Sequence, residues 1–140
     1  MLDYQKILNQ NMLNVLKVVL KNIKENGLSN QNHLYITFLT NDKNVIIPKW
    51  LKDKYPEEMT IIIQYEYYDI KIENDFFEIT LSFNDVKTKL KIGYDAVISF
   101  ADPSANFGLK LKSINLNQKK SKQNLETSNN IINFPTLKKN

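Results

Sequence analysis

Residues 55–83, YPEEMTIIIQYEYYDIKIENDFFEITLSF, contain the pattern that decides the fold. Apolar and aromatic side chains alternate with polar ones along residues 59–67, and the alternation returns along residues 77–83 after Asn74-Asp75. A period of two is typical of β-strands that bury one face. The stretch therefore predicts a hairpin of two strands with one face buried in the core and the other face available for binding.

The flanking segments extend this pattern into a mainly β protein. Residues 3–26 repeat apolar side chains at helical spacing and are followed by Gly27, which predicts an N-terminal α-helix. Alternating or apolar runs predict further strands at 33–39, 45–47, 86–92, 96–101 and 107–112, and a helical turn at 49–54. One helix followed by about seven short strands predicts a small antiparallel barrel or two packed antiparallel sheets.

Charge and composition divide the chain into a neutral body and a basic tail. Residues 1–112 hold 14 Lys and 14 Asp or Glu, so the net charge of +4 belongs to the remainder. We predict one folded domain over 1–112, a flexible polar linker over 113–130, and a terminal segment over 131–140 in which apolar residues return. That apolar cluster is either incidental or a tethered docking peptide.

Residues that commonly carry catalysis are scarce. The chain has no cysteine and one histidine, His33, which excludes Cys-His catalysis and the usual zinc sites. Its three glycines stand far apart, so no phosphate-binding loop is expected. The carboxylates around the predicted turns are better explained as solvent-exposed surface groups than as acid-base catalysts. We expect no enzyme activity, catalytic residue, metal or cofactor. Without a signal peptide or membrane-length apolar run, a cytoplasmic protein is expected.

The outward face of the predicted hairpin suggests a ligand site. Along residues 76–83 the outward side chains shrink towards Thr80 and Ser82, and residues 96–101 also contain small side chains. If these strands are neighbours, they form a trough for an extended peptide. The expected aromatic walls are Tyr67, Phe76 and Phe100. An Sm-like module for single-stranded RNA is the alternative, although the carboxylates near these aromatics would repel phosphate.

The apolar arc of the predicted helix is too wide for a single contact. Leu13, Val18 and Leu20 extend the arc beyond the stripe that one sheet would cover. The helix is therefore either a core helix with some exposed apolar groups or a core helix that also forms a dimer seam.

Three segments together resemble the stringent starvation protein B (SspB) family, in its short alphaproteobacterial-type branch. They are YPEEMTIIIQYEYYDI, ENDFFEITLSFNDV and AVISFADPSANFGLKL, and the resemblance covers residues 4–112. It implies an N-terminal helix with an Sm-like pair of antiparallel sheets. It also implies a non-catalytic adaptor that delivers ssrA-tagged proteins to the ClpXP protease, without membrane contact.

The resemblance also implies roles for individual residues. The ssrA peptide would contact Gln64, Tyr65, Thr80, Leu81, Ser82, Ile98 and Phe100. Homodimerisation through the helix would use Leu13, Leu16 and Leu20. Docking on the N-terminal domain of ClpX would use Ile131, Ile132, Phe134, Leu137, Lys138 and Lys139. The tail departs from the family pattern at Pro135, where an acidic or polar residue is expected, and lacks the expected Arg-containing ending.

Overall fold

The computed structural model describes residues 1–29 and 31–111. Its helices are α1 (Tyr4–Asn26) and α2 (Lys49–Lys54), with short 3-10 turns η1 (Tyr94–Ala96) and η2 (Pro103–Ala105). Its strands are β1 (Leu34–Leu39), β2 (Val45–Ile46), β3 (Glu58–Ile63), β4 (Tyr67–Ile72), β5 (Phe76–Phe83), β6 (Val86–Gly93), β7 (Val97–Asp102) and β8 (Phe107–Lys110). The predicted linker and terminal segment lie outside the described residues.

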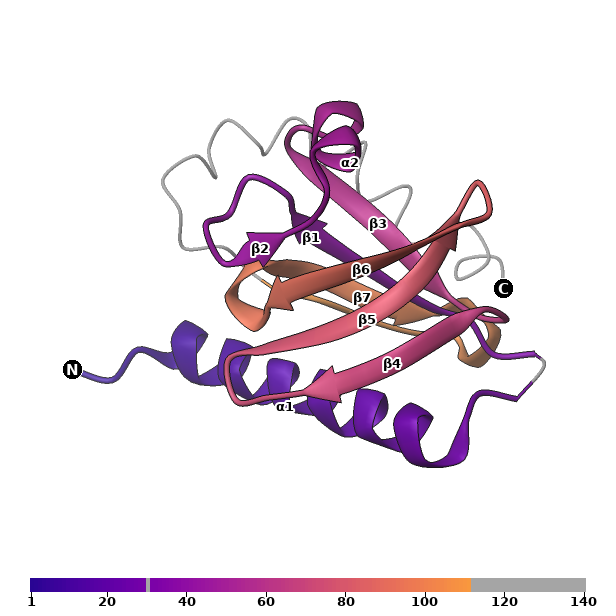
Figure 1. The fold of residues 1–140 in the computed structure, drawn as a ribbon. Helices are drawn as coiled ribbons and strands as arrows, with labels where there is room; N and C mark the ends of the chain where they lie inside the picture. Colours follow the sequence, from indigo (N-terminus) through magenta and orange to yellow (C-terminus); the bar gives the residue numbers. More distant parts are fainter. Residues whose placement is uncertain (30, 112–140) are drawn as a thin grey trace.

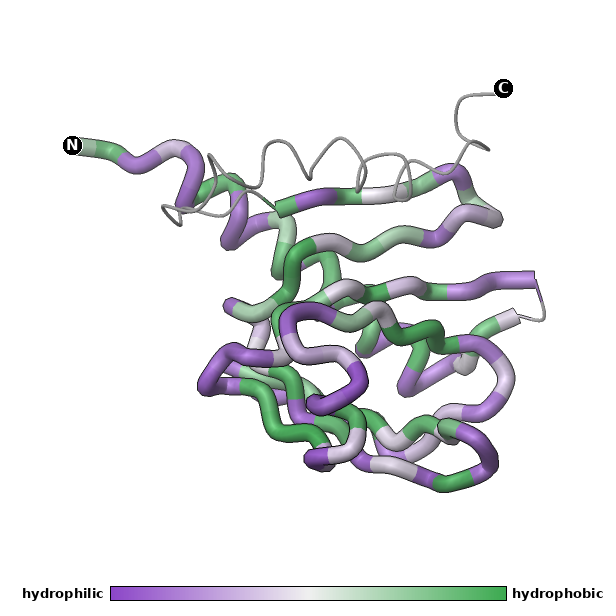
Figure 2. The backbone as a smooth tube through the Cα atoms, turned by 90° about the horizontal axis from the view of Figure 1, so that it is seen from above, coloured by the Kyte–Doolittle hydropathy of each residue, from purple (hydrophilic) through white to green (hydrophobic). Residues whose placement is uncertain are grey.

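The strands form two antiparallel four-stranded sheets, as predicted. The first sheet has the order β3-β1-β7-β8 and the second the order β2-β6-β5-β4. In Figure 1 the second sheet lies in front of the first, α1 runs beneath β4, and α2 lies at the opposite side. Figure 2 shows the same layers from above, with hydrophobic segments along the strands. The core is the apolar layer between the sheets, closed at one side by α1.

Local signals at both ends define α1. The Asp3 side chain caps the helix by accepting a hydrogen bond from the Lys6 backbone N–H at 3.1 Å. At the other end Gly27 has a φ of 80°, and its N–H donates to the Ile23 carbonyl at 2.8 Å. A positive φ suits glycine because it has no Cβ. The predicted helix and its stop at Gly27 are therefore confirmed.

The prediction that residues 59–67 form the first strand of the hairpin is wrong, because these residues do not form one strand. β3 ends at Ile63 and pairs with β1, whereas β4 begins at Tyr67 and pairs with β5. Between them Tyr65 is 70 % exposed. Buried positions are odd-numbered in β3, but Ile70 is the buried residue of β4. One regular strand cannot bury both sets on one face, so the chain bends and changes sheet.

The turn between β5 and β6 offers a stability test. Phe83 pairs with Val86, and the two residues between them, Asn84 and Asp85, have φ values of 54° and 66°. Two positive φ angles are typical of the type I′ hairpin turn, where glycine is preferred second. We expect Asp85→Gly to raise the free energy of unfolding by about 0.5 kcal/mol in urea denaturation.

The matched control for this turn is Asp53→Gly, which places glycine in the exposed helix α2. This change should lower the free energy of unfolding by about 0.5 kcal/mol, through lower helix propensity and loss of the Lys49–Asp53 ion pair. If Asp85→Gly destabilised the protein as much as the control does, relief of backbone strain at the turn would be ruled out.

Candidate functional site

The residues predicted for peptide binding do not line one trough. β5 lies in the second sheet between β6 and β4, whereas β7 lies in the first sheet between β1 and β8. The predicted adjacency of these strands is therefore wrong, and Ile98 and Phe100 lie in the sheet opposite Thr80 and Ser82. Phe100 is 1 % exposed and Leu81 is 4 % exposed, so both side chains belong to the core.

A smaller site remains on the outer face of the second sheet. Thr80 and Ser82 are half-buried there, on the side of β5 opposite to the core. Across the sheet, Thr80 pairs with Tyr68 of β4 and with Lys89 of β6, while Ser82 pairs with Lys87. These five residues form what we call the small-residue trough. In it, two short hydroxyl side chains stand between the longer side chains of Tyr68 on one strand and Lys87 and Lys89 on the other.

Two of the aromatic walls expected from the sequence lie elsewhere. Tyr67 pairs with the core residue Leu81, and its hydroxyl accepts a hydrogen bond from the Leu28 backbone N–H at 3.1 Å. It therefore anchors the segment after α1 rather than lining the trough. Phe76 stands at the other end of β5, where the Lys91 ammonium lies 4.3 Å from the ring centroid. The wall is Tyr68, which sequence periodicity alone did not single out.

A cation–π contact crosses the small-residue trough. The Lys87 ammonium lies 4.3 Å from the centroid of the Tyr68 ring. Lys87 is opposite Ser82 and Tyr68 is opposite Thr80, so the contact passes diagonally over the floor. Such a contact at an exposed site is worth about 0.5–1 kcal/mol, which a ligand can readily displace. Because lysines cover both outer-face rings, Tyr68 and Phe76, the arrangement does not favour base stacking.

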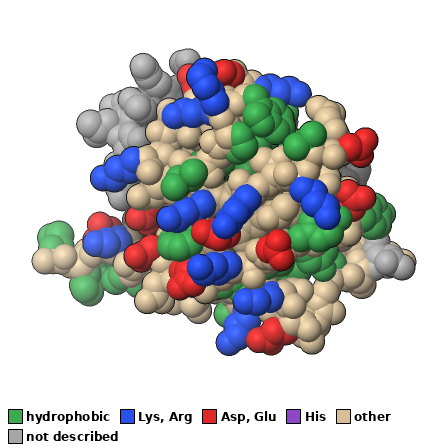
Figure 3. Space-filling model, viewed as in Figure 1, with side chains coloured by type: hydrophobic (Ala, Val, Ile, Leu, Met, Phe, Trp, Pro, Cys, Tyr) green, Lys and Arg blue, Asp and Glu red, His purple; other side chains and the backbone are tan. Residues whose placement is uncertain are grey.

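Lysine side chains line one side of the trough, along β6. Lys87, Lys89 and Lys91 follow one another outward on β6, and Figure 3 shows lysines spread over the front of the second sheet. Glu78 offsets one of them, because its carboxylate lies 3.3 Å from the Lys89 ammonium. The trough therefore has a positive rim.

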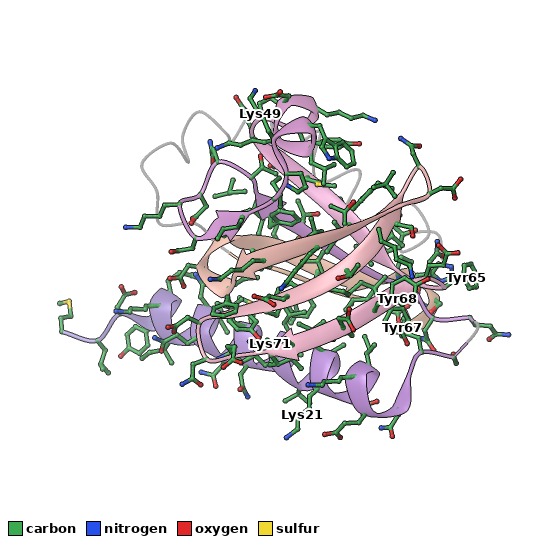
Figure 4. All side chains as sticks on the ribbon, viewed as in Figure 1. Lys21, Lys49, Tyr65, Tyr67, Tyr68 and Lys71 are labelled. Carbon is green, nitrogen blue, oxygen red and sulfur yellow. The ribbon has the colours of Figure 1, made fainter. Side chains whose placement is uncertain are left out.

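The bend between the sheets meets the trough at one end. Gln64 is half-buried and Tyr65 is exposed in this bend. Figure 4 shows Tyr65, Tyr67 and Tyr68 gathered at the end of the molecule where β4 begins. Because β4 and β5 are antiparallel, that end is also where β5 carries Ser82. The bend that carries Gln64 and Tyr65 thus lies at one end of the trough, but the Tyr65 ring packs against the His33 ring, with 6.3 Å between their centroids.

The comparison with protein families decides what kind of protein this is. The family model described as SspB, Stringent starvation protein B, matches residues 6–135. The chain belongs to the SspB family. The matched region includes almost all of the described fold and continues into the terminal segment. No curated protein matches the chain.

Membership of the SspB family assigns a general adaptor role and fits a protein that is not an enzyme. Among residues 1–29 and 31–111, no group of three His, Asp or Glu side chains is placed to hold a metal ion. In the same part of the chain, no helix is long and apolar enough to cross a membrane.

The helix residues predicted for an SspB-type dimer require a correction. Leu16 and Leu20 are 0 % exposed because they pack into the core of their own chain, so that part of the prediction is wrong. Leu13 faces a cavity beside the second sheet. The exposed apolar residues of α1 lie on another side of the helix, and they are Tyr4, Ile7, Leu8, Val15 and Val18.

The cavity beside Leu13 has a volume of about 740 Å³ and lies between α1 and the beginning of β5. Lys17 spans it, because its ammonium donates to the Asn74 carbonyl at 3.0 Å and lies 4.8 Å from the Tyr94 ring centroid. Asp75 and Asp95 also line the cavity. Charges of both signs are therefore present, and nothing in the lining selects one class of ligand.

Tyr94 lines this cavity, and its buried hydroxyl group allows a test of what an unpaired polar group costs the stability of the SspB fold. The residue is 3 % exposed, and its hydroxyl has no hydrogen-bond partner among the described residues. A buried unpaired hydroxyl costs about 1–3 kcal/mol. Tyr94→Phe is therefore expected to raise the free energy of unfolding at pH 7 by about 1 kcal/mol in urea denaturation.

The same substitution changes the response to alkaline pH. Burial, with a smaller contribution from Glu73, raises the pKa of Tyr94 from 10.0 to about 12. The folded state therefore holds this proton more tightly than the unfolded state, so the free energy of unfolding falls as pH rises from 10 towards 12, where only the unfolded state readily loses the proton. Tyr94→Phe should lose less stability over this range, and the exposed control Tyr4→Phe should behave as wild type. A less stable Tyr94→Phe protein would contradict an unpaired hydroxyl.

Proposed function

We propose that this chain binds ssrA-type tag peptides and tethers tagged proteins to the ClpX unfoldase for degradation by ClpXP. The observation that carries the proposal is the extent of the SspB family match, from residue 6 to residue 135. The match joins a folded domain to a terminal segment in which apolar residues return after a polar stretch. Tethering requires both parts, one for the cargo and one for the protease.

The small-residue trough is the proposed tag site. Thr80 and Ser82 leave room for side chains of an extended peptide, and Tyr68 supplies an apolar wall. Gln64 lies half-buried at the same end, where its amide offers both a donor and an acceptor to a peptide backbone. The positive rim formed by Lys87 and its neighbours suits a tag with acidic residues or a C-terminal carboxylate.

A homodimer is the second part of the proposal. The exposed apolar side chains of α1 form a stripe that residues 1–29 and 31–111 leave uncovered, and such stripes commonly mark protein contacts. A second copy would cover the stripe and double the number of tag sites and terminal segments. Two weak contacts in one assembly increase the overall avidity.

The terminal segment is the proposed ClpX-docking element. Its apolar residues and final lysines, Ile131, Ile132, Phe134, Leu137, Lys138 and Lys139, follow the polar stretch 113–130. A docked segment holds the cargo near the unfoldase at an effective concentration of up to about 1 mM for a suitable flexible linker. We propose that the protein acts in the cytoplasm together with these partners.

Titration of the full chain with a fluorescent ssrA peptide tests the tag proposal directly. We expect saturable binding with a dissociation constant below about 50 μM, and no binding of a peptide with the same composition in scrambled order. Absence of binding by the folded protein at that concentration would overturn tag recognition.

A further inference from the structure

An apolar patch lies between α2 and the β5–β6 turn. The Trp50 ring of α2 packs edge-on against the Phe83 ring of β5, with 6.3 Å between the ring centroids and 78° between the ring planes. Phe83 in turn pairs with Val86 across the β5–β6 hairpin. Trp50 is 45 % exposed and Val86 is 54 % exposed. We call these three residues the tryptophan patch, and Figure 3 shows hydrophobic side chains gathered in this part of the surface.

The tryptophan patch is exposed because the β5–β6 hairpin extends beyond the core. Leu81 and Leu90 are buried on the inner face of the second sheet, and Phe83 and Val86 lie on the same face of their strands. Phe83 is half-buried because Trp50 packs on it, whereas Val86 is exposed. The tip of the hairpin therefore presents core-type side chains that residues 1–29 and 31–111 leave partly uncovered.

The chain itself contains a segment of matching chemistry within reach of the tryptophan patch. Residues 112–130, 19 in number, separate the end of the described fold from the apolar residues of the terminal segment. An unstructured chain of 19 residues has a root-mean-square span of about 24 Å. A folded body of about 110 residues has a radius of gyration of about 13 Å. The terminal segment can therefore reach the patch from the end of the fold.

Charge favours the same pairing. The carboxylate of Asp85 stands exposed beside Val86, and it forms no ion pair with any group of residues 1–29 and 31–111. Lys87 lies on the opposite face of β6, where its ammonium contacts the Tyr68 ring. Lys138 and Lys139 directly follow the apolar residues of the terminal segment. A segment that covers the patch can thus bring its lysines towards a free carboxylate.

We infer that residues 131–137 dock on the tryptophan patch of their own chain and that ClpX must displace them from it. This inference rests on the docking role of the terminal segment in the proposed function and adds a regulation of that role. The stripe of α1 is covered by the second copy in the proposed homodimer, whereas the tryptophan patch stays open to the segment. Because the same apolar side chains would contact either the patch or ClpX, the two contacts exclude each other.

The contact needs little intrinsic affinity to be occupied. The effective concentration of the segment around its own fold is about 1 mM, so a contact with an intrinsic dissociation constant of about 1 mM is closed in about half of the chains. Closure then weakens the apparent affinity for ClpX only about two-fold, because the affinity is reduced by the open fraction. The segment is shielded in the free protein and still available to the unfoldase.

Trp50 is the single tryptophan of the chain, so its fluorescence reports on the patch directly. Acrylamide quenching of the full chain is compared with that of the chain lacking residues 131–140. The segment shields the ring in closed chains, so the deletion should raise the quenching constant about two-fold and shift the emission to longer wavelength. Equal quenching of the two proteins would overturn the inference.

A matched pair of substitutions identifies the occupant of the patch. Phe134→Asp places a charge among the apolar residues of the terminal segment and should reproduce the effect of the deletion. Leu125→Asp places the same charge in the polar stretch and should leave quenching as in the unaltered chain. A difference that vanishes on dilution from about 50 to about 0.5 μM would place the segment of a second copy on the patch and overturn docking within one chain.

Val86→Asp tests the patch itself. Val86 is exposed beside a turn, so the fold should survive the change, and thermal unfolding verifies this. In this background, deletion of residues 131–140 should no longer alter the quenching constant, because both changes open the same contact. Ile62→Asp, at an exposed apolar site on β3 in the first sheet, is the matched control and should preserve the effect of the deletion. A deletion effect that persists in Val86→Asp would overturn the assignment of the patch.

Binding to ClpX separates the inference from the function on which it rests. With half of the chains closed, Val86→Asp should lower the dissociation constant for ClpX about two-fold. Unchanged affinity in a chain that quenching shows to be closed would overturn the competition between patch and ClpX. Failure of every variant to bind ClpX would overturn the proposed docking role and its regulation, whereas quenching alone decides the contact with the patch.

Discussion

Ser82→Gln is expected to weaken binding of a fluorescent ssrA peptide by at least about ten-fold, equivalent to about 1.4 kcal/mol. Ser82 is half-buried in the floor of the small-residue trough, opposite Lys87. Glutamine is longer than serine and would fill the space proposed for a peptide side chain. Fluorescence anisotropy measures the change in dissociation constant directly.

Thr60→Gln is the matched control for this experiment. Thr60 is an exposed hydroxyl residue on the outer face of β3, in the first sheet, where the same longer amide is introduced away from the trough. It should bind the peptide as wild type does. Equal thermal unfolding of both variants would show that neither change damages the fold. If Ser82→Gln also bound normally, the tag site would lie elsewhere on the protein.

Deletion of residues 131–140 is expected to abolish the acceleration of ClpXP degradation while leaving tag-peptide binding unchanged. Without the docking segment the bound cargo must meet ClpX by free diffusion, and the advantage of an effective concentration of about 1 mM is lost. At about 10–100 μM protein this corresponds to a loss of about 10–100-fold in delivery. The measurement is the initial degradation rate of a tagged fluorescent protein at a concentration below its KM.

A deletion of equal length provides the control. Removing residues 113–122 shortens the polar stretch but keeps the terminal segment, so most of the acceleration should remain. Undiminished delivery after removal of 131–140 would contradict the docking assignment. Equal losses in both deletions would indicate that chain length, rather than the apolar segment, is what delivery requires.

Several elements were predictable because their causes are local. Asp3 and Gly27 lie at the ends of α1, where a side-chain cap and a positive φ act within one turn of the helix. Alternation in β5 and β6 likewise identified their inward side chains, including Ile79 and Leu90, which are fully buried. Each of these features depends on residues a few positions apart, so a single sequence contains the whole signal.

Strand partners were less predictable, because alternation does not specify which strand lies beside another. The sequences of β5 and β7 both predict apolar strands with small outward residues. If these two strands were neighbours, Phe100 would lie beside Thr80. The hydrogen-bond register instead puts Tyr68 and Lys89 beside Thr80. The proposed tag site therefore keeps Thr80 and Ser82 from the sequence prediction, whereas its neighbours Tyr68 and Lys89 are known only from the fold.

By itself, the sequence determined that an N-terminal helix precedes short strands and that residues 77–83 form a strand with one buried face. It also showed that residue types common in catalytic sites are scarce. Tertiary structure alone decided that residues 59–67 divide between two sheets and that Leu16 and Leu20 face their own core. The physical reason is distance along the chain. Helix caps and strand faces arise between near neighbours, whereas sheet order and helix orientation depend on contacts between segments far apart.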